Sequence, residues 1–310
     1  MQLWTHPACL LHDTGPGHAE RPERLTAVLE ALRDAFPDLP WHEAPRATRG
    51  QLLRVHADSL LATVLDTHSP GRVHLDPDTV LSPASAEAAL RAAGAAVAAT
   101  DAVLHATDPS ARRAFCAVRP PGHHATADVA MGFCLFNSIA VAAAHARDDG
   151  GLSRIAIVDF DVHHGNGTQA IFEHDPRVLY LSSHQSPLYP DTGYPDERGV
   201  GNVLNAPLRP ASGGDALRAA WEGVLLPALE AFRPQLVLVS AGFDAHWRDP
   251  LAQLQWQAAD YAWLTGRLVD IADRHAGGRI VSMLEGGYDL QALRECSVAH
   301  VDVLQRAGER

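Results

Sequence analysis

The chain is poor in cysteine and contains no Cys-x-x-Cys pair among its 310 residues. Its four cysteines, Cys9, Cys116, Cys134 and Cys296, are scattered along the sequence. This pattern argues against a disulfide framework and against a cysteine-based zinc site. We therefore expect reduced thiols and a cytoplasmic protein.

Long apolar runs and an excess of basic charge are missing as well. No apolar run reaches the ~18 residues that span a bilayer, and the amino terminus lacks the pattern of a signal peptide. The 25 basic residues are outnumbered by 37 acidic ones, which gives a formal net charge of −12. Because phosphate binding needs clustered positive charge, we expect neither a nucleic-acid nor a membrane partner. The negative charge is compatible with a cationic substrate.

Short apolar segments alternate with helical patterns through the second part of the chain. Strands are expected at 113–118, 154–160, 177–182, 235–240 and 279–284. Helices are expected at 20–34, 50–66, 84–106, 137–147, 167–173, 215–232, 257–275 and 289–306. Segments 1–18 and 184–214 are rich in glycine, proline and polar residues, so we expect loops there. The alternation predicts an α/β protein whose parallel sheet lies between helices, in a single domain over residues 1–310.

Histidine is abundant, with 18 residues, and its informative members are the pairs His123–His124 and His163–His164. Both pairs follow expected strands, where the ligand site of an open α/β sheet lies. The other polar residues that follow expected strands are Ser183, His184, Asp244 and Tyr288. Together they predict one site at the carboxyl edge of the sheet.

Residues 155–167 carry the densest part of this pattern, an apolar strand that ends in aspartate and histidine. Asp159, Asp161 and His163 alternate onto one face of the strand. Asp161, His163 and Asp244 offer three ligands, which leaves positions for water and substrate, as in a catalytic zinc site. Zinc and other divalent metals, including Fe(II), fit this donor set.

The remaining polar residues suggest acid–base chemistry beside that metal. His123 and His124 are candidates for general acid and base, with Asp159 and Asn166 as orienting partners. Tyr288 can donate its hydroxyl to a developing oxyanion. This combination is typical of metal-assisted hydrolysis of an amide or ester.

Four motifs resemble the zinc-dependent histone deacetylase superfamily. They are Pro121-Gly122-His123-His124-Ala125, the run 159–169 that begins Asp-Phe-Asp-Val-His-His, Ser240-Ala241-Gly242-Phe243-Asp244-Ala245 and Leu284-Glu285-Gly286-Gly287-Tyr288. The Asn166-Gly167-Thr168-Gln169 form is similar to class II members and related bacterial amidohydrolases. The resemblance extends from about residue 6 to residue 300, and it implies the arginase–deacetylase fold, with a parallel sheet of about eight strands.

The resemblance also implies roles for individual residues. Asp161, His163 and Asp244 would hold one zinc ion. His124 would be the general base and acid, His123 would act electrostatically with Asp159, and Asn166 would lie against His124. Tyr288 would polarise the scissile carbonyl. The positions implied for substrate binding are Phe133, Tyr189, Leu251, Gly132, Gly286 and Gly287.

Two structural sites for K⁺ or Na⁺ are implied as well. Asp159, Ser182 and Ser183, with the main chain of Asp161 and His163, resemble one of them. Phe172, Asp175 and Val178 resemble the other.

Two departures from the family pattern bear on specificity and assembly. Leu251 stands where polyamine-specific relatives carry an acidic gatekeeper, which disfavours a polyamine substrate. No insertion resembles the dimer-forming loop of those relatives, so we expect a monomer or a weak homo-oligomer.

Three functions remain open on the sequence. The first is removal of acetyl or other acyl groups from lysine side chains of proteins or peptides. The second is deacetylation of small acetylated amines or polyamines by the same residues. A non-catalytic protein that binds acyl-lysine is the third, and the intact ligand set and Tyr288 disfavour it. The paired-aspartate motifs of an arginase-type manganese hydrolase are absent.

Overall fold

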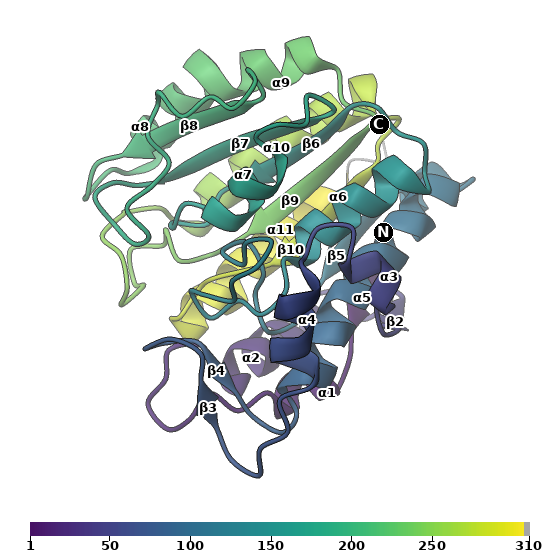
Figure 1. Ribbon diagram of the computed structural model, residues 1–310. Coiled ribbons are helices and arrows are strands. Elements are labelled where there is room, and N and C mark those ends of the chain that lie inside the picture. Colours follow the sequence, from purple (N-terminus) through teal and green to yellow (C-terminus); the bar gives the residue numbers. More distant parts are fainter. Residues whose placement is uncertain (307–310) are drawn as a thin grey trace.

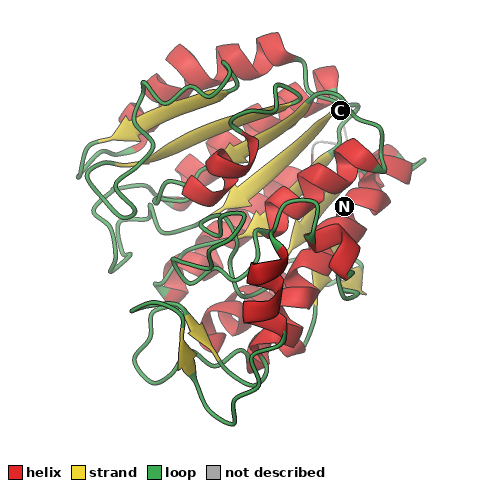
Figure 2. Ribbon diagram, viewed as in Figure 1, coloured by secondary structure: helices red, strands yellow, loops and turns green. Residues whose placement is uncertain are grey.

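Eight parallel strands form the central sheet (Figures 1 and 2) of this computed structural model, which describes residues 1–306. Their spatial order is β2-β1-β5-β10-β9-β6-β7-β8. The strands are β1 (Gln2–Thr5), β2 (Trp41–Glu43), β5 (Arg113–Cys116), β6 (Ile155–Asp159), β7 (Val178–Gln185), β8 (Val203–Leu208), β9 (Leu236–Ala241) and β10 (Ile280–Leu284). A separate antiparallel pair joins β3 (Val73–His74) to β4 (Val80–Leu81).

Helices cover both faces of the sheet. In Figure 1, α6 and α7 lie in front of the strands, and α10 and α11 lie behind them. The helical elements are α1 (Ala8–Leu11), α2 (Pro22–Ala35), α3 (Arg49–Leu52), α4 (Asp58–Leu65), α5 (Ser85–His105), η1 (Pro109–Ala111), α6 (Ser138–Asp148), α7 (Asn166–Phe172), α8 (Gly214–Ala220), the π-helix η2 (Trp221–Leu225), α9 (Leu226–Phe232), α10 (Ala258–His275) and α11 (Leu290–Arg306). Within residues 1–306, no helix has both the length and the apolar character required to cross a membrane.

The inner strands are apolar because both of their faces are covered. Every residue of β5, β6, β9 and β10 is buried. A parallel sheet with helices on both sides favours such continuous apolar runs. The prediction of these four strands and of β7 from the sequence is therefore confirmed.

The outer strands were not predicted, and the reason is their exposure. Strands β1, β2 and β8 each contain partly exposed residues, so they lack a continuous apolar run. The prediction that 1–18 and 184–214 are loops was wrong where β1, α1 and β8 form. Strand β7 also continues to Gln185, so Ser183 and His184 lie within the strand and not after it.

Two expected helices are interrupted. The expected helix at 50–66 divides into α3 and α4, with turns and bends between them. The expected helix at 215–232 contains the π-helix η2 just before Pro227. Proline removes a main-chain donor and disturbs the turn before it, which accounts for an irregularity at this point.

Helix α5 approaches its neighbouring loop closely at Gly94. A Cβ atom there would lie 1.9 Å from the Pro45 carbonyl oxygen. We predict that Gly94→Ala lowers the free energy of unfolding by about 2 kcal/mol or more, because the main chain must move. The measurement is urea denaturation of the whole chain.

Gly266 in α10 provides the matched control. A Cβ atom there would have its nearest neighbour, Val303 Cγ1, at 3.9 Å. Gly266→Ala should raise the free energy of unfolding by about 0.5–1 kcal/mol through helix propensity. Equal effects of the two substitutions would contradict the packing seen at Gly94.

Candidate metal and active site

The strand order places the expected site residues at one edge of the sheet. Neighbouring strands β5, β10, β9 and β6 end side by side. The residues that follow them include the His123–His124 pair, Tyr288, Asp244 and Asp161. Residues separated by more than one hundred positions in the sequence therefore meet in space.

Asp161, His163 and Asp244 form a buried cluster whose candidate ligand atoms all lie within 4.8 Å of one another. His163 Nδ1 is 3.1 Å from Asp161 Oδ1 and 3.2 Å from Asp244 Oδ2. Main-chain N–H groups hold the other carboxylate oxygens: Gly286 donates to Asp161 Oδ2 at 2.8 Å and Val162 donates to Asp244 Oδ1 at 2.9 Å. These bonds aim the remaining lone pairs at a common point.

The donor set fits a divalent metal. Asp244 Oδ2 is buried and accepts no hydrogen bond. Burial opposes a charged imidazole, yet the carboxylates of Asp161 and Asp244 raise the pKa of His163 to about 10. The cluster thus stabilises positive charge, which a metal ion supplies without a proton. Two carboxylates and one imidazole suit zinc and neighbouring transition metals.

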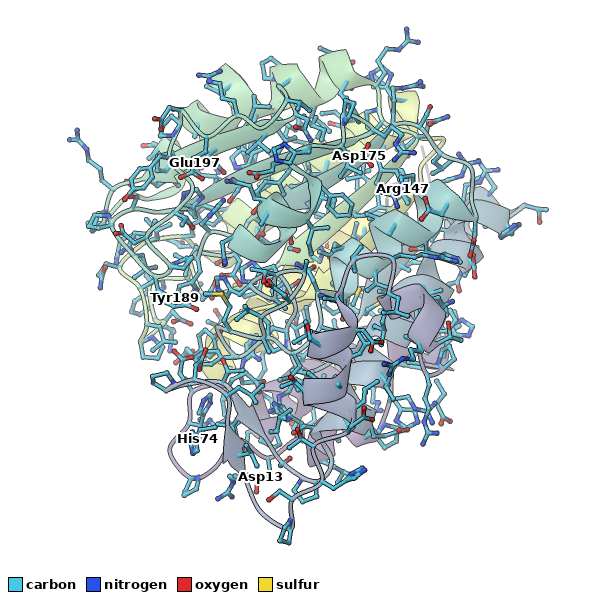
Figure 3. All side chains as sticks on the ribbon, viewed as in Figure 1. Asp13, His74, Arg147, Asp175, Tyr189 and Glu197 are labelled. Atoms are coloured by element: carbon cyan, nitrogen blue, oxygen red, sulfur yellow. The ribbon has the colours of Figure 1, made fainter. Side chains whose placement is uncertain are left out.

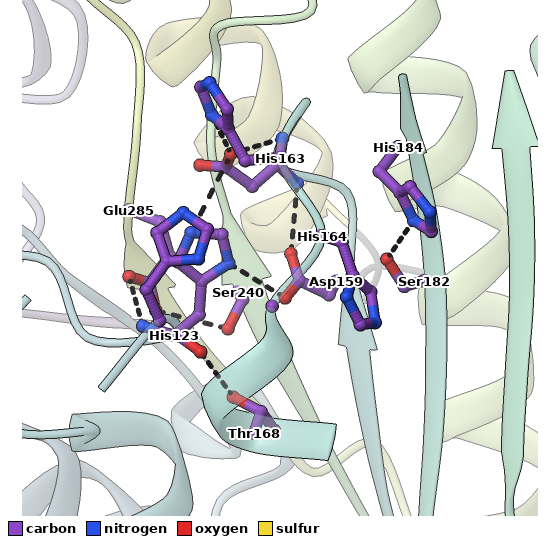
Figure 4. A network of polar contacts seen from close by, with 12 residues as sticks. His123, Asp159, His163, His164, Thr168, Ser182, His184, Ser240 and Glu285 are labelled. Carbon is purple, nitrogen blue, oxygen red and sulfur yellow. Dashed lines mark hydrogen bonds and ion pairs between the residues drawn. The ribbon is translucent and has the colours of Figure 1, made fainter. Parts of the chain in front are cut away.

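The two histidines of the first motif lie beside this cluster with different partners, and Figure 4 shows His123 with Asp159. His123 Nδ1 donates to Asp159 Oδ2 at 3.0 Å, and His124 Nδ1 donates to Asn166 Oδ1 at 2.8 Å. Their rings are 4.0 Å apart between centroids.

The pKa values of His123 and His124 differ as well. Against the effect of burial, Asp159 and Asp161 raise the pKa of His123 to about 10. Burial, followed by the positive charges of His123 and His163, lowers the pKa of His124 well below its ordinary value. These shifts favour the charged form of the His123 imidazole and the neutral form of the His124 imidazole.

Tyr288 stands on a turn that is held from two sides. Its main-chain N–H donates to Asp249 Oδ2 at 2.8 Å. The guanidinium of the buried Arg24 donates to the carbonyl oxygens of Glu285 at 2.6 Å and Gly287 at 2.5 Å. It also lies 4.8 Å from the centroid of the Tyr288 ring. The sequence patterns did not reveal Arg24 and Asp249 as site residues, although Arg24 stands in a stretch that resembles the family.

A cavity of about 250 Å³ opens onto this site. Its lining residues are Asp78, His124, Gly132, Phe133, His163, Leu188, Tyr189, Leu251 and Tyr288. Phe133 packs edge-on against Tyr288, and Tyr189 packs edge-on against His124. The structure therefore brings together most of the residues expected to bind substrate, and it adds Asp78 and Leu188.

Gly286 and Gly287 have a different environment. Neither glycine is among the described residues that line the cavity. Gly286 lies against the carboxylates of Asp161 and Asp244, and the Gly287 carbonyl accepts from Arg24. Their close contacts support the cluster and the Tyr288 turn.

His184 supports the segment that carries Tyr189. Its Nε2 donates to the Gly193 carbonyl at 3.0 Å, and its Nδ1 is 2.9 Å from Ser182 Oγ. The neighbouring His164 Nδ1 is 2.7 Å from Thr192 Oγ1. Both rings thus contact the segment that follows Tyr189, and Figure 3 labels Tyr189.

The residues expected at the two monovalent-cation sites have different surroundings. Asp159 and Ser182 are wholly buried and pair across β6 and β7, and Ser183 Oγ accepts from Trp221 Nε1 at 3.1 Å. The carbonyl oxygens of Phe172, Asp175 and Val178 converge, but they converge on the side-chain amide of Asn202.

Fold and site together define an α/β protein with a candidate metal centre at the carboxyl edge of a parallel sheet. The chain matches the histone deacetylase domain model over residues 18–304. It therefore belongs to the histone deacetylase family. Relatives named as deacetylases and amidohydrolases support hydrolase activity.

Two of these relatives are similar over most of their length. The chain is 41% identical to the histone deacetylase-like amidohydrolase of Pseudomonas aeruginosa, over 96% of this chain and 83% of that protein. The solved HDA15 HD domain has a TM-score of 0.92 at 36% identity, covering 98% of this chain and 89% of that one. The expected arginase–deacetylase fold is thus confirmed.

A human relative is named polyamine deacetylase HDAC10. It is 38% identical over 97% of this chain, but the match spans only 46% of that longer protein. Two chloroplastic plant histone deacetylases also match, over about two thirds of this chain and half or less of their own length.

The contact between Gly286 and the metal-ligand carboxylates gives a prediction. A Cβ atom at Gly286 would lie 2.0 Å from Asp244 Oδ2 and 2.5 Å from Asp161 Oδ2. We expect Gly286→Ala to weaken zinc binding by about 10- to 100-fold, because both carboxylates must move. Competition with a chromogenic chelator measures this affinity. Gly71→Ala is the control, since no atom lies within 4 Å of its added Cβ, and it should bind zinc as tightly as the unaltered protein.

Proposed function

We propose that the protein is a zinc-dependent amidohydrolase that removes acetyl groups from lysine side chains of proteins or peptides. One observation carries the proposal: His124, His163 and Tyr288 line the same cavity. A neutral imidazole, a metal ligand and a phenol therefore face one space that a substrate can enter. The family membership supports deacetylation as the reaction class.

The cavity walls suit an acyl-lysine side chain. Phe133 and Tyr189 are aromatic walls, and Leu251 and Leu188 add apolar surface. Aromatic rings contact a chain of methylenes well, and they leave its polar end to the groups at the bottom of the cavity.

Asp161, His163 and Asp244 would hold the zinc ion, which supplies Lewis-acid activation of water and of the acetyl carbonyl when bound. His124 Nε2 takes a proton from the attacking water, since its Nδ1 is engaged by Asn166. Tyr288 donates its hydroxyl to the carbonyl oxygen as negative charge develops there. The charged His123, paired with Asp159, stabilises the same charge from the other side.

Collapse of the adduct breaks the C–N bond. The proton held by His124 passes to the leaving nitrogen, which departs as an amine, and the acetyl group departs as acetic acid. Transfer of the acid's proton to the amine then gives acetate and an ammonium ion. One water molecule is consumed, so atoms and charge balance. The same residue thus acts first as a base and then as an acid.

A second candidate, deacetylation of small acetylated amines or polyamines, is favoured by Asp78. This carboxylate lines the cavity, where it can attract a second positive charge of the substrate. The human relative named for polyamine deacetylation points the same way. Leu251, in place of an acidic gatekeeper, favours the lysine substrate.

We further propose that a structural K⁺ or Na⁺ ion binds beside Asp159, Ser182 and Ser183, and that the protein works as a monomer or weak homo-oligomer. The four free, buried cysteines support a cytoplasmic location.

Replacement of Tyr288 tests the reaction. Tyr288→Phe should keep its zinc content and fold, but lose about 10²- to 10³-fold in kcat, because only the oxyanion donor is removed. Elemental analysis gives the zinc content, and amine release gives the rate. The chain contains no lysine, so an amine-reactive reagent meets no lysine background from the enzyme.

The substrates are an acetyl-lysine peptide and an N-acetylated polyamine, each with and without a zinc chelator. A higher kcat/KM for the polyamine would favour the second candidate. Tight binding of both compounds without amine release would instead indicate a binding protein. Near-normal turnover by Tyr288→Phe would refute the role assigned to the phenol, and two manganese ions per chain would refute the single-zinc site.

A further inference from the structure

Glu285 is a buried carboxylate to which the mechanism above assigns no role. It is 1% exposed and directly follows β10. Its Oε2 accepts from the main-chain N–H groups of Gly122 at 2.6 Å and His123 at 3.2 Å. Its Oε1 accepts from Ser240 Oγ at 3.2 Å. One side chain thus connects the ends of three strands, as Figure 4 shows for His123, Ser240 and Glu285.

The main chain of Glu285 begins the turn that carries Tyr288. Arg24 fixes the carbonyl of Glu285, and the Gly286 N–H is bound to Asp161. The position of the Glu285 backbone is therefore set independently of its side chain. The side chain then reaches across to the segment that carries His123 and His124.

We propose that Glu285 is a positioning residue, whose carboxylate fixes the His123–His124 segment relative to Tyr288. This inference rests on the proposed function, in which His124 and Tyr288 act on the same substrate carbonyl. Catalysis of this kind depends on the spacing of the two groups, and a displacement of about 1 Å can cost about 10²-fold in rate. Among the residues that the structure describes, Glu285 Oε2 is the acceptor of both main-chain donors, at Gly122 and His123.

The burial of this carboxylate has a cost. Burial raises the pKa of Glu285 to about 7, which shows that the surroundings disfavour its charge. A buried ionisable group seldom improves stability over an apolar residue of similar size. The hydrogen bonds from Glu285 to the His123–His124 segment therefore explain the presence of a carboxylate at this position better than a gain in stability does.

Two substitutions at Glu285 distinguish the effect of side-chain length from the effect of charge. In Glu285→Gln, the amide oxygen can still accept from Gly122 and His123, and the amide NH₂ can donate to Ser240 Oγ. In Glu285→Asp, the charge remains but the side chain is one methylene too short. We expect Glu285→Gln to stay within about 3-fold of the normal kcat, and Glu285→Asp to lose ~10-fold or more with little change in KM.

Ser240→Ala is the matched control, because it removes only the bond to Oε1 and should leave kcat unchanged. Normal kcat for Glu285→Asp, or an equal loss for Glu285→Gln and Glu285→Asp, would overturn the proposal. Crystal structures of both variants provide a readout that needs no activity: the distance between the His124 and Tyr288 side chains should change only in Glu285→Asp. If the unaltered protein hydrolyses no acylated amine, the proposed function fails, while this distance still decides the role of Glu285.

A separate observation concerns Asn202, which precedes β8. Its Nδ2 lies 2.8 Å from the Phe172 carbonyl oxygen, 3.1 Å from that of Asp175 and 2.8 Å from that of Val178. These three carbonyls are the ones expected from the family resemblance to bind a second monovalent cation. The structure places an amide NH₂ group at the point where they converge.

The orientation of the Asn202 amide has its own support. The Val200 N–H donates to Asn202 Oδ1 at 3.2 Å, so the NH₂ end faces the three carbonyls. The Asp175 side chain does not compete, because its carboxylate pairs with Arg147 and Arg177. Figure 3 shows Arg147 beside Asp175. The Phe172 carbonyl belongs to the last turn of α7, which needs donors from outside the helix.

We infer that the Asn202 amide takes the place of the second cation. Its two hydrogens point toward the three carbonyl oxygens that an ion would otherwise contact. The residues present therefore do not fit an ion at this point. This inference concerns a structural contact and is independent of the proposed function.

Crystals of the full chain soaked in rubidium chloride test the inference directly. We expect no anomalous peak for Rb⁺ beside the carbonyls of Phe172, Asp175 and Val178. A peak there would overturn it. Thermal unfolding in potassium chloride and in choline chloride gives a second measurement.

In choline chloride, Asn202→Ala should have a lower Tm than the unaltered protein. Potassium chloride should raise the Tm of this variant more than it raises the Tm of the unaltered protein. Asn205→Ala is the control, since Asn205 is also buried but contacts Gln169 and none of the three carbonyls. It should show the same K⁺ response as the unaltered protein. An Asn202→Ala variant with unchanged Tm and unchanged K⁺ response would contradict the inference.

Discussion

Buried negative charge at the carboxyl edge of the sheet is the constraint on which the site depends. Five carboxylates there are at most 6% exposed: Asp159, Asp161, Asp244, Asp249 and Glu285. Charges taken out of water are stable only when they are paired or hydrogen-bonded. The elements around these carboxylates supply the groups that pair or hydrogen-bond with them.

Several kinds of group stabilise these five buried carboxylates. Main-chain N–H groups face Asp161, Asp244, Asp249 and Glu285, while His123 faces Asp159. The glycine at 286 allows the main chain to approach two of these carboxylates closely. Asp161, His163 and Asp244 could hold a metal ion, which would complete the balance of charge at this edge.

The sequence predicted the parts of this arrangement that have a local signal. Continuous apolar runs revealed the inner strands, and the residues after them revealed His123, His163, Asp244 and Tyr288. Partly exposed β1, β2 and β8 have no such run. Their existence followed only from the family resemblance, which implied about eight strands.

The positioning residues were harder to predict for a different reason. Glu285 and Asp249 bind main-chain N–H groups, which every residue except proline possesses and which leave no trace in the sequence. Arg24 binds carbonyl oxygens more than 260 positions away. Asp78 lines the cavity although it belongs to a turn beside the small β3–β4 pair. Such contacts become visible only when the chain is folded.

The strand order also has a consequence for the synthesis of the chain. Strands β10 and β9 lie between β5 and β6, although both follow them by more than 75 residues in the sequence. A growing chain that has not yet reached β9 holds β5 and β6 with open, apolar edges. The sheet closes only after its last quarter has been made, and until then these edges are exposed to other chains. The same long-range insertion that assembles the candidate metal site thus leaves the unfinished chain with two unpaired apolar strand edges.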